Sequence, residues 1–240
     1  MSGHSKWNNI KGRKEKSDAQ RAKIFTMMGR QIMVAMAHGT DPDSNPSLKN
    51  AIQKAKQNNM PNDKIKAILD RGNNQDMSNF SEITYEGYGV GGVAVIVKCL
   101  TDNKNRTSSD VRYAFDKFGG SMGATGCVSY MFENKGIIIL EKTDSFDSDS
   151  AMELALEIDA IDCEDDEVFT VFVEPNADAV EKASNCFTEK GYSVLSAGVE
   201  LVPQNYTTLT ESQKETFEKM VNKLEDSDDV QEVIHNLSEE

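Results

Sequence analysis

The spacing of apolar residues changes once along this chain of 240 residues, close to Gly72. Before that point apolar residues recur every three or four positions, which predicts amphipathic helices. After it, runs rich in β-branched residues predict strands that alternate with helices. The charge changes at the same place, because residues 1–72 hold 14 lysines and arginines against six acidic residues, whereas the whole chain has a formal net charge of -14. We therefore expect a basic helical region followed by an acidic region that contains strands.

Three helices are predicted in the basic region. Capping residues and apolar spacing place them from Ser17 to about residue 37, from the Asn45-Pro46 cap onwards, and from about residue 61 to 72. In the first helix Lys16, Lys23 and Arg30 are seven residues apart, so they form one stripe on the side away from Phe25 and Ile32. We expect that helix to pack through its apolar side and to present these cations on the other.

The acidic region is predicted to begin with a strand at residues 93–97, a helix capped by Thr107 and a strand at 126–132. Six elements then follow in the order β-α-β-β-α-β, which is the ferredoxin-like arrangement. They are a strand at 136–141, a helix at 148–158, strands at 161–164 and 168–174, a helix at 177–190 and a strand at 193–202. Residues 210–237 are predicted to form two acidic helices that are interrupted near Ser227.

Gly87 to Gly92 match the pattern G-x-G-x-x-G of dinucleotide-binding loops. That motif requires a helix directly after it, because the helix N-terminus holds the pyrophosphate. Here the predicted strand at 93–97 follows instead, so we reject a nucleotide site. The glycines are expected to allow the backbone to approach a neighbouring element closely.

Residues 101–107 form a polar turn before a predicted helix. Two interpretations stay open for Asn105 and Arg106 in this turn. Free backbone N–H groups and the arginine would bind a phosphate, or the turn is an ordinary capped loop whose Asp and Asn side chains satisfy their own backbone.

Residues 4–14, which we call the arm, combine cations, an aromatic ring and amides, with Trp7 as the only tryptophan of the chain. This combination is typical of segments that contact phosphates and stack on bases. Two alternatives stay open: a solvated tail, or a Trp7 side chain that folds back on the helices. The predicted nucleic-acid-binding residues of the arm and of the regions above are His4, Lys6, Trp7, Lys11, Arg13, Lys14, Lys16, Lys23, Arg30, Asn105 and Arg106.

Several other classes of protein are not expected from this sequence. It has no apolar run long enough to span a membrane and no secretory signal. The four cysteines, Cys99, Cys127, Cys163 and Cys186, and the three histidines lack metal-ligand spacing, and no catalytic constellation stands out. We therefore predict a cytoplasmic, non-enzymatic protein without a cofactor, a metal or a small-molecule substrate.

Several motifs spread over almost the whole chain occur together in one known family. They are Gly3-His4-Ser5-Lys6-Trp7, Asn9-Ile10-Lys11, Arg13-Lys14, Lys23-Ile24-Phe25-Thr26, Asp41-Pro42, Asn45-Pro46, Asn59-Met60-Pro61, Tyr85-Glu86-Gly87-Tyr88-Gly89, Gly91-Gly92-Val93-Ala94 and Leu100-Thr101-Asp102-Asn103. With them the chain resembles the YebC/PmpR family, which includes mitochondrial translational activators of cytochrome c oxidase.

The resemblance implies an α+β fold with three domains. These are an N-terminal helical bundle (1–75), a central α/β domain (76–133 plus 203–240) and a ferredoxin-like domain inserted into it (134–202). It further implies a DNA-binding transcriptional regulator, or alternatively a ribosome-associated translation factor that binds ribosomal RNA and relieves stalling at proline-rich stretches. The residues favour RNA slightly, because no recognition helix of a helix-turn-helix is evident and Trp7 suits unstacked bases better than a duplex groove.

Overall fold

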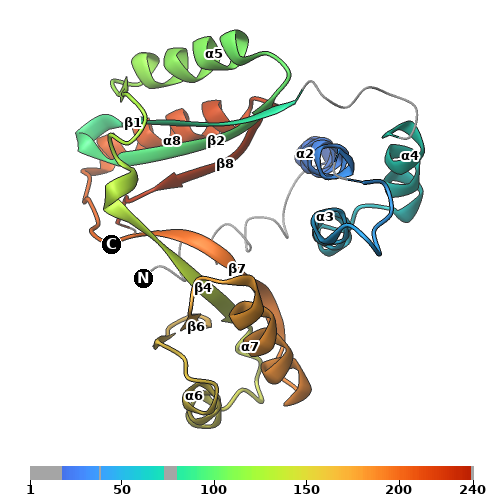
Figure 1. The fold of residues 1–240 in the computed structure, drawn as a ribbon. Coiled ribbons are helices and arrows are strands. Elements are labelled where there is room, and N and C mark those ends of the chain that lie inside the picture. The colour runs from blue at the N-terminus through green and yellow to red at the C-terminus, as the bar shows by residue number, and fades with distance from the viewer. Residues whose placement is uncertain (1–17, 38, 73–79, 239–240) are drawn as a thin grey trace. The chain divides into compact units, whose positions relative to one another are not determined.

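The computed structural model describes residues 18–37, 39–72 and 80–238 (Figure 1). The described residues form an α+β fold with seven α-helices and two four-stranded antiparallel sheets. They divide into two compact units, of which one is Ser129–Tyr206 with Ser238, and the other comprises residues 18–128 together with Thr207–Leu237. The boundaries expected at residues 75, 133 and 202 stay predictions.

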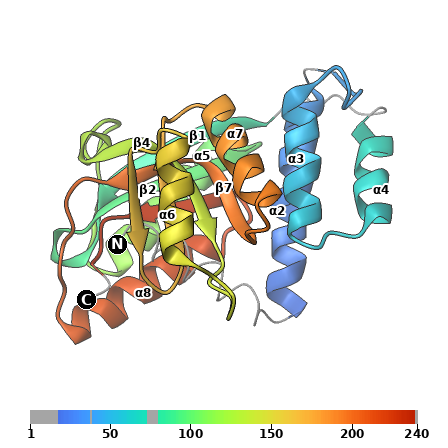
Figure 2. The same cartoon turned by 90° about the horizontal axis from the view of Figure 1, so that it is seen from below.

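Three helices, α2 (Asp18–Met36), α3 (Pro46–Gln57) and α4 (Asn62–Gly72), pack around one hydrophobic core (Figure 2). Ile32 and Leu48 are fully buried in it. Asn45 caps α3 by accepting a hydrogen bond from the Leu48 N–H at 3.1 Å, as its sequence position predicts. The predicted helices are confirmed, while the cap expected at Ser17 lies outside the described residues.

The first sheet has the strand order β3-β1-β2-β8. Its strands are β1 (Ser81–Tyr88), β2 (Ala94–Thr101), β3 (Ser121–Met122) and β8 (Val230–His235). Helices α5 (Lys104–Lys117) and α8 (Glu211–Glu225) share a core with alternate residues of β2, so both cover the same face of this sheet (Figure 1). Phe115 and Phe217 are the largest side chains of that core.

The helix start predicted at Thr107 is wrong, because α5 begins at Lys104. Asn103 is the capping residue, and its side chain accepts a hydrogen bond from the Arg106 N–H at 3.1 Å. Thr107 therefore lies inside the helix, where its hydroxyl donates to the Asp229 carboxylate at 2.8 Å.

Two further predictions are also wrong: the strand expected at 126–132 and the second acidic helix expected after Ser227. Residues 126–131 form turns and a short 3-10 helix (η2, Ser129–Met131) instead of a strand. The buried Glu86 carboxylate accepts hydrogen bonds from the N–H groups of Gly126 and Val128, at 2.8 and 2.9 Å, which holds this loop curled. The second acidic helix after Ser227 is strand β8, whose backbone pairs with β2.

The G-x-G-x-x-G segment leads from β1 through a 3-10 turn (η1, Val90–Gly92) into β2, so no helix follows it. Gly91 has a φ of 69°, which favours glycine. A Cβ atom on Gly87 would lie 2.9 Å from Phe115. The predicted strand after this segment and the expected close approach of its backbone are both confirmed.

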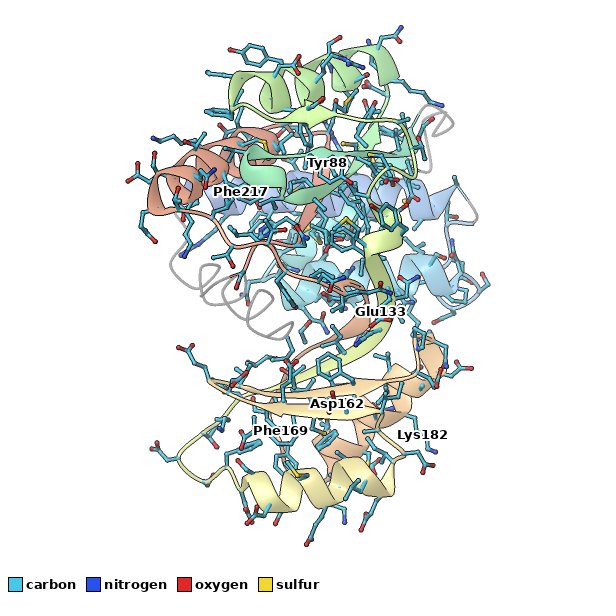
Figure 3. All side chains as sticks on the ribbon, turned by 90° about the vertical axis from the view of Figure 1, so that its left-hand side faces the viewer. Tyr88, Glu133, Asp162, Phe169, Lys182 and Phe217 are labelled. Carbon is cyan, nitrogen blue, oxygen red and sulfur yellow. The ribbon has the colours of Figure 1, made fainter. Side chains whose placement is uncertain are left out.

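The second unit contains six elements in the predicted β-α-β-β-α-β order, with the sheet order β5-β6-β4-β7. They are β4 (Phe132–Leu140), α6 (Ser148–Glu157), β5 (Asp162–Asp165), β6 (Phe169–Val173), α7 (Ala177–Glu189) and β7 (Val194–Pro203). Both helices share a core with one face of the sheet, and Phe169 extends from β6 into it (Figure 3). In α6, Ala155 is buried, whereas Met152 and Leu156 are exposed.

Candidate nucleic-acid interface

The arm residues of the predicted interface, together with Lys16, lie outside the described part of the chain. They are His4, Lys6, Trp7, Lys11, Arg13, Lys14 and Lys16. Their contact with nucleic acid stays a prediction based on residue type and spacing. Four other predicted residues, Lys23, Arg30, Asn105 and Arg106, are described.

Lys23 is half-buried on α2 and lies among acidic groups. Burial lowers the pKa of its ammonium, while the charges of Asp226, Glu225 and Asp228 raise it again. These acidic residues lie at the C-terminal end of α8 and just after it. Their negative charges cancel part of the positive potential of Lys23 within the protein.

Arg30 makes an ion pair with the same end of the chain. Its Nη1 atom lies 2.8 Å from the Asp229 Oδ1 atom and donates a second hydrogen bond to the Asp228 carbonyl at 2.6 Å. Its guanidinium also lies 5.8 Å from the centre of the Phe80 ring. The expectation that α2 presents this cation to solvent is therefore wrong. Helical spacing did not reveal the ion pair, because its partner is distant in the sequence.

Arg106 binds the same carboxylate from the other side. Its Nη2 atom lies 2.8 Å from the Asp229 Oδ2 atom and 2.8 Å from the Asp102 Oδ1 atom. Asn105, one position earlier, is exposed in the first turn of α5. The structure thus brings Arg30 and Arg106 together, but on a shared protein carboxylate.

The Asp229 side chain is only 5% exposed and accepts hydrogen bonds from four residues. The donors are Arg30, Arg106 and the hydroxyls of Thr101 and Thr107. Burial alone would raise the pKa of Asp229, but these hydrogen bonds together hold it below its ordinary value. We call these five residues the Asp229 cluster, and its geometry indicates a structural role.

Five lysines on α3 and α4 have no such acidic partners in the described residues. Lys49, Lys54, Lys56, Lys64 and Lys66 are all exposed, and none of them makes an ion pair with another described residue. Lys64 rests over the Phe25 ring, 4.9 Å from its centre, and is exposed to solvent. These five lysines are the strongest uncompensated positive charge that the structure describes in the bundle.

A groove of about 530 Å³ lies between α3 and α4. Residues that line it are Pro42, Lys49, Ile52, Gln53, Lys56, Asn62, Ile65, Lys66 and Leu69. The sequence analysis did not predict this groove. The seven-residue interval between Lys49 and Lys56, with Ile52 between them, was the available signal for one mixed face.

The described residues hold no group of three or more His, Cys, Asp and Glu side chains arranged for a metal ion. The four cysteines are unpaired thiols, and burial raises the pKa of Cys99 to about 12, which makes it a poor nucleophile. None of the helices in the described ranges is long and apolar enough to cross a membrane.

Comparison with known proteins gives matches along the whole chain. Residues 5–75 match the family model described as the TACO1/YebC protein N-terminal domain, and residues 80–237 match the TACO1/YebC second and third domain. A probable transcriptional regulatory protein of Caldicellulosiruptor saccharolyticus is 46% identical, with 100% of both chains covered. One of Acetivibrio thermocellus is 48% identical over 98% of each chain.

A solved structure shares the fold. The crystal structure of a conserved hypothetical protein from Aquifex aeolicus superposes with a TM-score of 0.79 at 37% identity. The match covers 93% of this chain and 92% of that one.

Proposed function

Because the chain belongs to the TACO1/YebC family, we propose that it is a non-enzymatic regulator of gene expression that binds nucleic acid through its basic N-terminal region. Its relatives are named probable transcriptional regulatory proteins, which supports a regulator rather than an enzyme. The leading form of the proposal is a cytoplasmic protein that binds DNA. Three domains, with the helical bundle at residues 1–75 as the binding domain, belong to the same proposal.

One observation carries the proposal: cations are concentrated in the first 72 residues of an otherwise acidic chain. A phosphate backbone is attracted to such a region and repelled by the rest, so the molecule binds in one orientation. The exposed lysines of α3 and α4 extend the positive surface beyond the arm. Arg30 and Arg106, which the sequence placed among the contacts, are assigned a structural role in this proposal, because both pair with the Asp229 carboxylate.

A ribosome-associated translation factor is the second candidate, and Trp7 favours it. An aromatic ring among cations suits stacking on unpaired bases, which ribosomal RNA offers and duplex DNA does not. In this form the arm binds ribosomal RNA and the protein relieves stalling at proline-rich stretches.

Binding of the full chain to duplex DNA and to ribosomes, measured across a salt series, separates the two candidates. Tight, sequence-selective duplex binding without ribosome co-sedimentation would exclude the translation factor. Co-sedimentation with ribosomes and only weak, unselective duplex binding would exclude the DNA-binding regulator. Binding to neither would overturn the proposal.

Deletion of residues 2–16 tests the role of the arm, because it removes Lys6, Lys11, Arg13, Lys14 and Lys16. The slope of log affinity against log salt should fall by a few units, at roughly 0.7–0.9 per phosphate contact. The exchange Trp7→Ala should weaken binding without changing the slope if the ring stacks on a base. Unchanged affinity in both variants would show that the arm makes no contact.

A further inference from the structure

The groove between α3 and α4 has an aliphatic floor and a cationic rim. Ile65 is 4% exposed and forms the deepest part of the floor, and Ile52 and Leu69 are half-buried beside it. Lys49 and Lys56 on α3 and Lys66 on α4 are exposed along the edges. An apolar floor that opens to water offers surface that a partner's apolar side chains can cover.

The helix positions explain why the groove exists. α3 and α4 both pack mainly against α2 and contact each other only sparingly, so their facing sides are not closed by each other. The two helices have 12 and 11 residues, which at about 1.5 Å per residue makes the groove about 16–18 Å long. About three turns of a third helix span that length.

The lining chemistry favours a protein helix over nucleic acid. Grooves for single strands stack bases on aromatic rings, and none of the described residues that line this groove is aromatic. Aliphatic side chains of a helix would cover Ile52, Ile65 and Leu69 and remove them from water. The three lysines, which pair with no acidic residue in the described ranges, favour a partner with negative charge beside those aliphatic side chains.

We propose that the α3–α4 groove binds an acidic amphipathic helix of a partner protein. Aliphatic side chains of this partner helix, spaced one and two turns apart along it, contact Ile52, Ile65 and Leu69. Its flanking Glu or Asp residues pair with Lys49, Lys56 and Lys66. The floor residues contribute no charge, so a substitution in the floor tests the apolar contacts without changing the electrostatic attraction of nucleic acid to the rim lysines.

The test uses the full chain and a synthetic peptide of about three to four turns that is held helical by a side-chain crosslink. The peptide carries Leu at positions i, i+4 and i+7 and Glu on both flanks. One control peptide has Ala in place of Leu at the same charge, and another has Lys in place of Glu. Fluorescence anisotropy measures the affinity, and methyl chemical shifts of isoleucine and leucine locate the site.

The acidic Leu peptide should bind with a Kd on the order of 10 µM, and both control peptides should bind at least tenfold more weakly. The exchanges Leu69→Gln and Ile52→Gln leave the charge unchanged, so each should weaken peptide binding at least tenfold while nucleic-acid affinity stays within twofold. Val199→Gln, at an exposed valine of β7, is the matched control and should change neither. An unchanged thermal midpoint verifies that each variant is folded.

Three results would overturn the proposal. The first is no saturable binding of the acidic Leu peptide up to about 1 mM. The second is equal binding of the Ala control peptide, which would mean that charge alone attracts it. The third is a loss of nucleic-acid affinity in Leu69→Gln with unchanged peptide binding, which would assign the groove to nucleic acid.

Discussion

The Asp229 cluster and the α3–α4 groove use cations in opposite ways. In the cluster, Arg30 and Arg106 each lie 2.8 Å from a carboxylate that is 5% exposed, and Arg106 also pairs with Asp102, so much of their charge is offset within the fold. Along the groove, Lys49, Lys56 and Lys66 face solvent, and none of them pairs with an acidic residue in the described part of the chain. The count of basic residues therefore overstates the size of the binding surface, because cations that pair within the fold attract an anionic ligand less than unpaired ones.

The difference also separates stability from binding. Removing a partner of a buried carboxylate leaves polar groups unsatisfied and destabilises the fold. Removing an exposed, unpaired lysine changes little within the protein and mainly changes its field. Substitutions in the two regions should therefore affect different measurements.

The largest expected effect follows from Asp229→Asn. The amide keeps the shape but loses the charge that faces two guanidinium groups, so the free energy of unfolding should fall by about 3 kcal/mol. Urea denaturation measures it. Glu232→Gln, which breaks the exposed pair with Lys98 at 3.0 Å, is the control and should cost less than about 1 kcal/mol. Equal losses would contradict a structural role for the cluster.

A smaller effect is expected at His235, which lies in β8 a few residues after Asp229. Burial lowers the pKa of this imidazole to about 4, and its ring packs edge-on against Phe217. The unfolded chain binds this proton near pH 6.5 and the folded chain only near pH 4, so stability falls as the pH decreases between those values.

The contribution of His235 to this pH dependence should reach about 2 kcal/mol at pH 4.5. Urea denaturation of the chain and of His235→Gln at pH 7 and at pH 4.5 isolates it, because the variant keeps every other titrating group. The native chain should lose more stability than the variant on acidification. Parallel losses would show that the imidazole is not held in its neutral form.

The smallest effect on stability is expected in the groove. Replacement of Lys49, Lys56 and Lys66 by Gln together should change the free energy of unfolding by less than about 0.5 kcal/mol, since each side chain is exposed. The same urea measurement applies. A loss above 1 kcal/mol would mean that these lysines hold the bundle together and are not available to a ligand.

Local features of the sequence predicted most of the fold. Caps such as Asn45 and the apolar spacing in α2 depend on neighbouring residues, and they predicted helices that the structure contains. Strand β8 was missed because its pairing partner β2 is far away in the sequence and its acidic surroundings suggested a helix. There the helix propensity of the segment is overridden by the backbone hydrogen bonds that β8 makes with β2.

The candidate site was harder to predict than the fold. The Asp229 cluster joins positions 30, 106 and 229, and no local pattern relates them. The groove depends on how two helices both pack on a third, which the pattern of a single helix does not contain. Because Asp229 is distant from Arg30 in the sequence, helical spacing alone predicted Arg30 to be among the solvent-facing cations.

The most direct test of the central claim compares Arg30→Gln with deletion of residues 2–16 in two measurements, the free energy of unfolding and the log–log salt slope of nucleic-acid binding. Arg30→Gln should lower stability by about 1–2 kcal/mol and leave the slope unchanged, because Asp229 already neutralises this cation. The deletion should lower the slope by a few units and leave stability unchanged. The opposite pattern, with the slope lost in Arg30→Gln and kept after the deletion, would contradict the division of cations into structural and ligand-binding groups.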